Sequence, residues 1–412
     1  MEHLKVSTAQ RIVLESVATL GNESIALQQS LGRVLSESIL ANRDLPPYDV
    51  SAMDGFAVRS ADLTSMPVIL KIVEDIRAGD MPTVTVQAGQ CSRIMTGAPM
   101  PQGADAVIQV EDTQQVSSDT VQIDKTVAIG NHVRSRGENM KLGEVVLPKD
   151  GEITPGVIGV LATVKATHVQ VYRHPRVAIL STGNELEAMH EPVDPNKIPD
   201  SNTYALMAQV QALGIEPALL GIARDDPAEL EQYLLRGLEY DVLLVSGGTS
   251  VGVHDYVRPT IEKLNVAMKF WRVAMKPGHP LAFGTTGKTA VFGLPGNPVS
   301  SMVCFEQFVA PALRRMMGNP RLYRRTVTAR LAHPARTRPG RTEFIRVQLT
   351  QDDAGYLASS TGTQSSGALL SMARADGLLV MPTAGASLAK GDLVTVQLLD
   401  GTAFQNNAGF KE

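Results

Sequence analysis

The chain has 412 residues, which at roughly 150 residues per domain is enough for two to four domains. Its 38 Lys and Arg residues against 42 Asp and Glu residues leave a formal net charge of −4. This balance argues against a nucleic-acid-binding protein, whose phosphate contacts need a basic excess, and an aromatic content of 4% offers few base-stacking side chains.

The N-terminal part of the chain predicts helix first and short strands afterwards. Its first segments carry apolar side chains at roughly helical spacing, so we expect one helix capped by Thr8 and a second over 25–40. The prolines of Leu45-Pro46-Pro47-Tyr48 then exclude helix. From 68 to 147 short apolar runs, Val84-Thr85-Val86 among them, alternate with Gly, Pro and Asp, which is typical of a small β barrel or sandwich.

The second half of the chain predicts buried strands that alternate with helices. Strands are expected at four continuous apolar runs, 177–180, 218–220, 242–245 and 290–292, and the runs 177–180 and 242–245 are typical of strands buried on both faces. Helices are expected to start at Pro155, Ser201-Asn202, Asp226-Pro227 and Asn297-Pro298. Between 176 and 320 this alternation indicates a doubly wound parallel sheet. After Gly318-Asn319-Pro320 short strands resume, so we expect a small C-terminal β domain.

The cysteines and the N-terminal residues indicate which cellular compartment to expect. Cys91 and Cys304 stand in no CxxC motif and cannot build a zinc-thiolate site, so we expect both to be buried as small apolar residues. The first five residues lack the apolar core of a signal peptide, and no run of about 18 apolar residues occurs. A reduced, cytoplasmic protein without a membrane span is expected.

Three predicted strands of the sheet are followed by segments suited to bind phosphate. These segments are Ser181-Thr182-Gly183-Asn184-Glu185, Ser246-Gly247-Gly248-Thr249-Ser250-Val251-Gly252 and Gly293-Leu294-Pro295-Gly296-Asn297-Pro298. Ligands of open parallel sheets bind where the strands end, and glycines let backbone N–H groups converge on an anion. One such loop alone is more simply a tight turn. Three in one sheet favour a phosphoester site, although no GxGxxG fingerprint follows any of these strands.

Carboxylates and a lysine extend this prediction. Glu185, Asp225 and Asp255 each follow a predicted strand, and oxygen-rich clusters of this kind suit Mg²⁺ together with substrate phosphates. Lys276, in a rigid loop of prolines and glycine, is a candidate for holding an oxyanion. For each residue the plainer interpretation is a solvated loop side chain, and Asp226 is expected to be a helix cap. The spacing of His254 and His279 is not that of metal ligands, and we expect both to support or contact an anion.

Two turn sequences in the predicted β region carry further polar groups. Asp54 lies in Ser51-Ala52-Met53-Asp54-Gly55, and Thr96 lies in Ile94-Met95-Thr96-Gly97-Ala98-Pro99. Alone, both read as ordinary turns. They would matter if this region closed over the phosphate site, from the same chain or from a second subunit.

Together these segments resemble one family, the MoeA-type molybdopterin molybdenumtransferases, which are related to the E domain of gephyrin. The resemblance rests on the three strand-end segments, the two turn sequences, and Lys276-Pro277-Gly278, whose order and spacing cover nearly the whole chain. It implies an elongated homodimer of four domains, with an α/β domain similar to that of molybdopterin adenylyltransferases. The expected domains are a discontinuous helical linker domain (1–44 and 140–175), a β-rich domain (45–139), the α/β domain (176–320) and a C-terminal β domain (321–412).

The resemblance also implies a reaction and its residues. Members take adenylylated molybdopterin and molybdate, insert molybdenum at the dithiolene, and cleave the adenylyl phosphoanhydride with Mg²⁺, releasing AMP. The implied catalytic residues are Asp54 and Thr96 on the partner subunit's side of the cleft, and Glu185, Asp225, Asp255 and Lys276 on the α/β side. The three acids of the α/β side are the implied Mg²⁺ ligands. The implied substrate-binding residues are Ser181, Thr182, Gly183, Ser246, Gly247, Gly248, Thr249, Ser250, Gly252, Arg272, Pro295, Gly296, Asn297 and, at the edge of the C-terminal domain, Ser366.

Three positions depart from the family pattern. Arg272 stands where many members carry a second lysine, Asn184 where an aspartate is frequent, and His279 where a basic residue is common. Molybdate and tungstate are tetrahedral dianions of similar size, so either fits this expectation. A molybdopterin adenylyltransferase or molybdoenzyme maturation proteins are candidate partners, and neither nucleic acid nor membrane is expected. Two other functions stay open, a molybdopterin adenylyltransferase and a non-catalytic scaffold like gephyrin.

Overall fold

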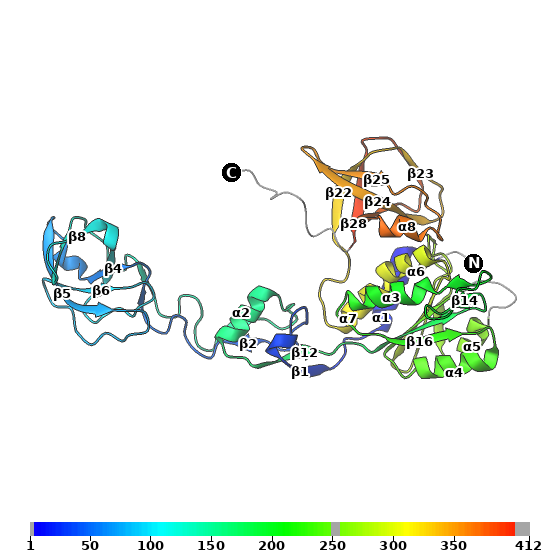
Figure 1. Ribbon diagram of the computed structural model, residues 1–412, viewed down its shortest axis with the longest axis horizontal. Helices are drawn as coiled ribbons and strands as arrows, with labels where there is room; N and C mark the ends of the chain where they lie inside the picture. The colour runs from blue at the N-terminus through cyan, green and yellow to red at the C-terminus, as the bar shows by residue number, and fades with distance from the viewer. Residues whose placement is uncertain (1–3, 249–255, 400–412) are drawn as a thin grey trace.

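The computed structural model describes residues 4–248 and 256–399 and has an elongated shape (Figure 1). A β-rich region lies at one end, and the α/β region with the C-terminal barrel lies at the other (Figure 1). Two extended segments of the chain and a small linker region connect the two ends (Figure 1). In the described residues no helix has the length and apolar character needed to cross a membrane.

The structure of the linker region differs from two predictions. Helix α1 (Val6–Ser16) begins two residues before Thr8, which is therefore not its N-cap. The predicted helix over 25–40 is wrong, because strand β1 (Asn22–Ala26) pairs with β12 (His168–Tyr172) and only a short 3-10 turn follows it. This pairing joins segments far apart in sequence, and such tertiary contacts override local helical spacing. The region also holds β2 (Ile39–Leu40), β11 (Val145–Leu147) and the expected helix α2 (Pro155–Thr163).

The β-rich region is built on one six-stranded sheet in the order β7-β4-β6-β5-β9-β8. Its strands are β4 (Gly55–Val58), β5 (Val68–Ile76), β6 (Gln90–Ile94), β7 (Ala106–Gln109), β8 (Thr113–Gln115) and β9 (Thr120–Ile123), and β3 (Val50–Ser51) pairs with β10 (Val133–Arg134) beside it. Gly55 is required in β4, because a Cβ there would lie 1.9 Å from the Ile108 carbonyl oxygen. The run Val84-Thr85-Val86 is not a strand, since the N–H groups of Thr83 and Val84 donate to the Glu74 carboxylate instead of to a neighbouring strand.

The α/β region confirms the predicted doubly wound sheet and adds two antiparallel strands. Its order is β16-β13-β17-β21-β20-β18. The four parallel strands are β16 (Ala218–Ala223), β13 (Val177–Thr182), β17 (Val242–Ser246) and β21 (Thr289–Leu294), and the antiparallel strands are β20 (Ala282–Thr286) and β18 (Ala267–Phe270). Helices α4 (Pro227–Gly237) and α5 (Val257–Lys263) cover one face. Helix α3 (Ser201–Gln211), α1 and the helices after β21 cover the other (Figure 1).

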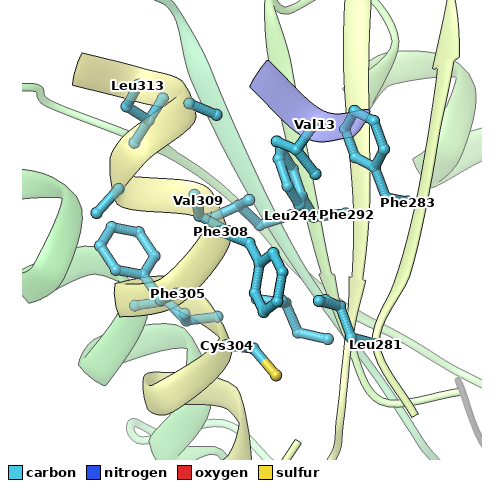
Figure 2. Close-up of a cluster of buried hydrophobic side chains, with 14 of the residues drawn as sticks. Val13, Leu244, Leu281, Phe283, Phe292, Cys304, Phe305, Phe308, Val309 and Leu313 are labelled. Atoms are coloured by element: carbon cyan, nitrogen blue, oxygen red, sulfur yellow. The ribbon is translucent and has the colours of Figure 1, made fainter. Parts of the chain in front are cut away.

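The largest hydrophobic core lies under a continuous helical run made of α6 (Pro298–Cys304), the π-helical segment η4 (Phe305–Val309) and α7 (Ala310–Met316). Figure 2 shows Phe305 and Phe308 from this run and Phe283 and Phe292 from the sheet, all fully buried. Each such side chain contributes roughly 1.5–3 kcal/mol on burial. Cys304 lies in this core, and burial raises the pKa of its thiol, so the predicted role as a small apolar residue is confirmed. Burial also raises the pKa of Cys91 to about 12.

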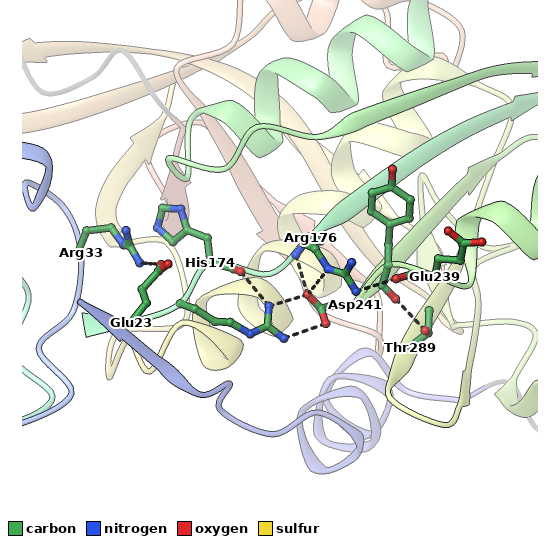
Figure 3. Close-up of polar contacts among 9 residues, drawn as sticks. Glu23, Arg33, His174, Arg176, Glu239, Asp241 and Thr289 are labelled. Carbon is green, nitrogen blue, oxygen red and sulfur yellow. Dashed lines mark hydrogen bonds and ion pairs between the residues drawn. The ribbon is translucent and has the colours of Figure 1, made fainter. Parts of the chain in front are cut away.

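A buried aspartate ties the linker region to the sheet. Arg173, which follows β12, donates two hydrogen bonds to Asp241, at 2.7 and 2.9 Å, and the Arg176 N–H donates a third at 2.8 Å (Figure 3). These bonds hold the pKa of Asp241 below its ordinary value. Nearby, burial lowers the pKa of His174 to about 4. Asp241 therefore fixes the direction in which the linker strand enters the α/β region.

The C-terminal region is a closed barrel. The pairings β24-β25-β22-β28-β26 return from β26 to β24, which leaves no free edge within the ring. Its strands are β22 (Thr326–Leu331), β24 (Thr342–Asp352), β25 (Gly355–Ser360), β26 (Gly377–Met381) and β28 (Leu393–Leu398), with a side pair β23 (Ala335–Thr337) and β27 (Ala386–Leu388) and helix α8 (Leu369–Ala373). Strand β19 (Met275–Lys276) of the α/β region pairs with β24, so the barrel is attached to the sheet domain.

Candidate active site

A cavity of about 700 Å³ lies where the parallel strands end. Its wall includes the predicted strand-end segments, the start of α3, and the C-terminal barrel. The lining residues are Thr182, Glu185, Leu186, Ile198, Pro199, Asp200, Ser201, Asn202, Ser246, Gly247, Gly248, Pro280, Pro295, Gly296, Asn297, Pro298, Gly367 and Leu369. The position agrees with the rule that ligands of open α/β sheets bind beyond the carboxyl ends of the strands.

The glycines of the cavity wall allow a close approach of the loops. Gly247 has φ +93°, and a Cβ on it would lie 2.5 Å from the Thr182 carbonyl oxygen, so a larger residue would push the two loops apart. The Gly247 N–H donates to the Leu294 carbonyl oxygen at 3.1 Å, which joins the ends of β17 and β21. Thr182 Oγ1 is buried and has no hydrogen-bond partner among the residues that the structure describes. It is thus an unused donor in the cavity wall.

The start of α3 is held by buried side chains. Asp200, and not Ser201 or Asn202, is the N-cap, because its carboxylate accepts the Thr203 N–H at 3.1 Å. Ser181 lies behind the cavity wall and not on it, and its hydroxyl is 3.1 Å from Asp200 and 2.9 Å from Thr203 Oγ1. Ser181 therefore supports the helix start. Asn202 and Asp200 were missed as site residues, since Asn202 was predicted only at a helix start and Asp200 was not singled out in the sequence.

The predicted acids of the α/β side are placed differently from one another. Glu185 lines the cavity and folds back over Gly183, where a Cβ would lie 2.6 Å from its carboxylate oxygens. Asp225 lies beside the cavity in a reciprocal pair with Asn184, in which each N–H donates to the other's side chain, at 3.3 and 3.1 Å. Among residues 4–248 and 256–399 no group of three or more His, Cys, Asp or Glu side chains is arranged to hold a metal ion.

Several predicted residues lie outside the described residues. They are Asp255, His254, Thr249, Ser250 and Gly252, all between 249 and 255.

The cationic residues lie at the junction with the barrel and not among the residues that line the cavity. Lys276 Nζ is 3.1 Å from Glu343 on β24, and its side chain is exposed. The side chain of Arg272 is exposed as well. His279 Nδ1 lies 2.8 Å from the Val273 carbonyl oxygen, so the ring is fixed to the backbone by this nitrogen. The Ser366 carbonyl oxygen accepts the Val299 N–H of α6 at 3.1 Å, which brings the barrel loop to the cavity.

Asp54 and Thr96 form a separate polar pair in the β-rich region. The backbone N–H and the hydroxyl of Thr96 both donate to Asp54 Oδ1, at 2.7 and 2.9 Å. These bonds lower the pKa of Asp54, whose exposed carboxylate is ionised at neutral pH. In one chain this region lies at the end opposite to the α/β region (Figure 1). The structure therefore does not bring the pair together with Glu185 within a single chain.

Three family models match successive parts of the chain. Residues 4–164 match the MoeA N-terminal region (domains I and II), residues 178–315 a probable molybdopterin binding domain, and residues 328–399 the MoeA C-terminal region (domain IV). A molybdopterin molybdenumtransferase of a Nostoc species is 36% identical over 91% of this chain and 88% of its own length. The chain belongs to the MoeA family of molybdopterin molybdenumtransferases. It is thus a transferase that acts in the biosynthesis of the molybdenum cofactor.

Further relatives of the MoeA family span nearly the whole chain. Molybdopterin molybdenumtransferase 2 of Mycobacterium tuberculosis is 35% identical and covers 95% of this chain and 98% of its own. The molybdopterin biosynthesis MoeA protein of Pyrococcus horikoshii has a solved structure that matches with a TM-score of 0.82 and 32% identity, over 96% of this chain and 99% of that one. The cavity lies largely within the residues matched by the molybdopterin binding domain, whereas Asp54 and Thr96 lie within the MoeA N-terminal match.

Proposed function

We propose that the protein inserts molybdate into adenylylated molybdopterin and, in a Mg²⁺-dependent step, hydrolyses the adenylyl phosphoanhydride to AMP and the molybdopterin phosphate. One molybdate oxygen leaves as water with the two thiol protons when the dithiolene sulfurs bind molybdenum. The observation that carries the proposal is the cavity at the strand ends, where glycine loops, two helix starts and Glu185 meet. Such a wall suits a phosphoester, because its glycine loops lack side chains that would keep a phosphate away and the Thr182 hydroxyl is an unused donor among the described residues. The sulfur ligands of molybdenum come from the substrate, and both cysteines of the chain are buried.

The residues of the cavity have distinct roles in this proposal. The Gly247 and Gly248 loop provides close backbone approach to the phosphates, and the Thr182 hydroxyl donates to a phosphate oxygen. Lys276 and Arg272 at the barrel junction attract the second anion, molybdate, and Lys276 leaves Glu343 to do so. Hydrogen-bond donors that are fixed in position in this way stabilise the charge that develops on the transferring group.

Glu185 is the residue of the cavity that we propose as a ligand of a magnesium ion. Mg²⁺ is bound in proteins by one or two carboxylates together with substrate phosphates and water. The Glu185 carboxylate lines the cavity, and Asp225 lies next to the same loop. Glu185, with Asp225 and Asp255 as the further ligands expected from the family, would hold the ion, which would act as a Lewis acid on the phosphate oxygens.

We further infer that the active site is shared between two subunits. Asp54 and Thr96 lie at one end of the elongated chain and Glu185 at the other (Figure 1). A second subunit in antiparallel arrangement would bring its Asp54 to the cavity of the first, as closed two-fold symmetry allows. Size-exclusion chromatography with light scattering should give twice the chain mass, and a monomer that is active would contradict the inference. The cytoplasmic location and the partner proteins stay predictions.

The reaction is tested with purified protein, adenylylated molybdopterin and Mg²⁺, with and without molybdate. We expect AMP release that depends on molybdate and that leaves molybdenum bound to molybdopterin. AMP release that is unaffected by molybdate would contradict the insertion reaction. No release with any combination, together with normal molybdoenzyme activity in cells that carry only the Asp54→Ala protein, would favour a scaffold.

A further inference from the structure

One side-chain amide lies where the start of α3 meets the end of β17 and the loop after β21. Asn202 is in the first turn of α3, is 9% exposed, and lines the cavity. It does not cap the helix, because Asp200 does so.

The amide nitrogen of Asn202 makes two hydrogen bonds that cross the site. It donates to Ser246 Oγ at 2.8 Å and to the Gly296 carbonyl oxygen at 2.8 Å. Ser246 is the last residue of β17 and is 1% exposed. Gly296 belongs to the loop between β21 and α6. One NH₂ group thus uses both of its hydrogens to hold the ends of two strands to the start of a helix.

These bonds act on the part of the backbone that contacts ligand in the proposed function. Gly247 directly follows Ser246, and a Cβ on Gly296 would lie only 3.8 Å from the Gly247 Cα, so the two loops are close neighbours. The Gly247 N–H already donates to Leu294 across the same gap. A shift of Asn202 would therefore change the spacing between the loops. In catalysis a misplacement of about 1 Å can cost roughly 100-fold in rate.

We propose that Asn202 is a positioning residue, which sets the spacing of the 246–248 and 294–297 loops for the transfer reaction through its two donor bonds. An amide is needed because the Gly296 carbonyl can only accept. Aspartate has the same shape without the donors, and its ionised carboxylate would repel that carbonyl oxygen. The activity part of this inference rests on the proposed function, whereas the loop spacing can be measured without it.

The structural test is backbone amide hydrogen exchange on wild type, Asn202→Ala and Asn202→Asp. We expect faster exchange in both variants at Gly247 and in the 294–297 loop, with wild-type exchange in the β-rich region. Asn22→Asp is the matched control, since Asn22 is exposed on β1 of the linker region. Wild-type exchange at these loops in a folded Asn202→Asp protein would overturn the inference.

The kinetic test measures AMP release across pH. For Asn202→Ala we expect kcat to fall about 100-fold with KM changed less than about threefold. Asn202→Asp should regain part of this activity as pH falls, because its protonated carboxyl can donate one hydrogen bond, and Asn202→Ala should not. Equal pH dependence of the two variants, or a change in KM alone, would contradict a positioning role. If the wild type releases no AMP, the proposed function fails, and hydrogen exchange still decides the role of Asn202.

Discussion

The two regions expected to form the active site are stabilised in opposite ways. In the α/β region buried polar side chains hold the cavity wall: Ser181, Asp200 and Asn202 are all less than a tenth exposed. In the β-rich region the carboxylate of Asp54 is exposed and held only by Thr96. The first region is organised for ligand before ligand arrives. The second presents an ionised group on an open surface, as expected of a group that completes a site on another subunit.

The two regions also lie at opposite ends of the elongated chain (Figure 1). A chain that kept both regions in one compact unit would need no linker. Instead, the linker region and the Asp241 joint hold them at opposite ends (Figures 1 and 3). In the proposed two-subunit site, the position of Asp54 against the cavity of the second subunit would depend on how firmly the linker is attached to the sheet.

The largest loss of activity is expected from removing a charge in the α/β region. Glu185→Gln keeps the shape of the side chain but removes the carboxylate that we propose as a Mg²⁺ ligand, so AMP release should fall about 1000-fold. Binding of molybdopterin should change little, because the loops stay in place. The measurement is single-turnover AMP release together with ligand binding by calorimetry. An equal loss of binding and turnover would mean that Glu185 organises the wall and does not hold the metal. For Asp255→Ala we likewise expect Mg²⁺-dependent cleavage to fall more than binding.

A smaller effect is expected at the joint between the regions. Asp241→Asn removes the charge that binds Arg173 twice and should lower the free energy of unfolding by about 2 kcal/mol. The folded-state pKa of Asp241 lies below the ordinary 3.8, so its stabilisation is present above that pH. The stabilisation is lost as pH falls through the folded pKa. Urea unfolding of both proteins should therefore differ at pH 7 and converge in strong acid, and a constant difference would contradict this origin.

The smallest effect is expected in the β-rich region, on the pKa of the exposed Asp54. Thr96→Val removes the hydroxyl that donates to Asp54, so the pKa of Asp54 should rise toward its ordinary value. The backbone N–H bond of residue 96 stays, which keeps the rise partial. Carboxyl-detected NMR titration checks the direction, with Thr96→Ser as the control that keeps the hydroxyl. An unchanged pKa in Thr96→Val would show that the backbone bond alone holds the carboxylate.

Much of the α/β region was predictable because its signals are local. Buried parallel strands read as continuous apolar runs, and Asp226-Pro227 marks the start of α4 as expected. The strand-end position of the cavity follows from the topology rule. The prediction of the linker region failed for the opposite reason. Strand β1 forms only because β12, about 146 residues later, pairs with it. Spacing along the chain does not show such a partner.

The supporting residues of the site were less predictable than its glycines. Asn202 was predicted only as part of a helix start and Asp200 was not predicted at all, and only the fold brings Asn202 to Ser246 and Gly296. Ser181 was predicted to bind substrate, but its hydroxyl bonds to Asp200 behind the wall. No sequence pattern marks a buried amide that donates both of its hydrogens, because its role depends on which acceptor oxygens the fold places opposite it.

The central claim, that each active site combines the β-rich region of one subunit with the α/β region of the other, is tested by mixing inactive variants. Asp54→Ala and Glu185→Gln proteins are unfolded together, refolded as mixed dimers, and assayed for molybdate-dependent AMP release. We predict about one quarter of wild-type activity, since about half of the dimers are mixed and each mixed dimer has one intact site. Mixing Glu185→Gln with Asp225→Ala should restore nothing. No recovery in the first mixture, with mixed dimers shown by mass spectrometry, would contradict the shared site.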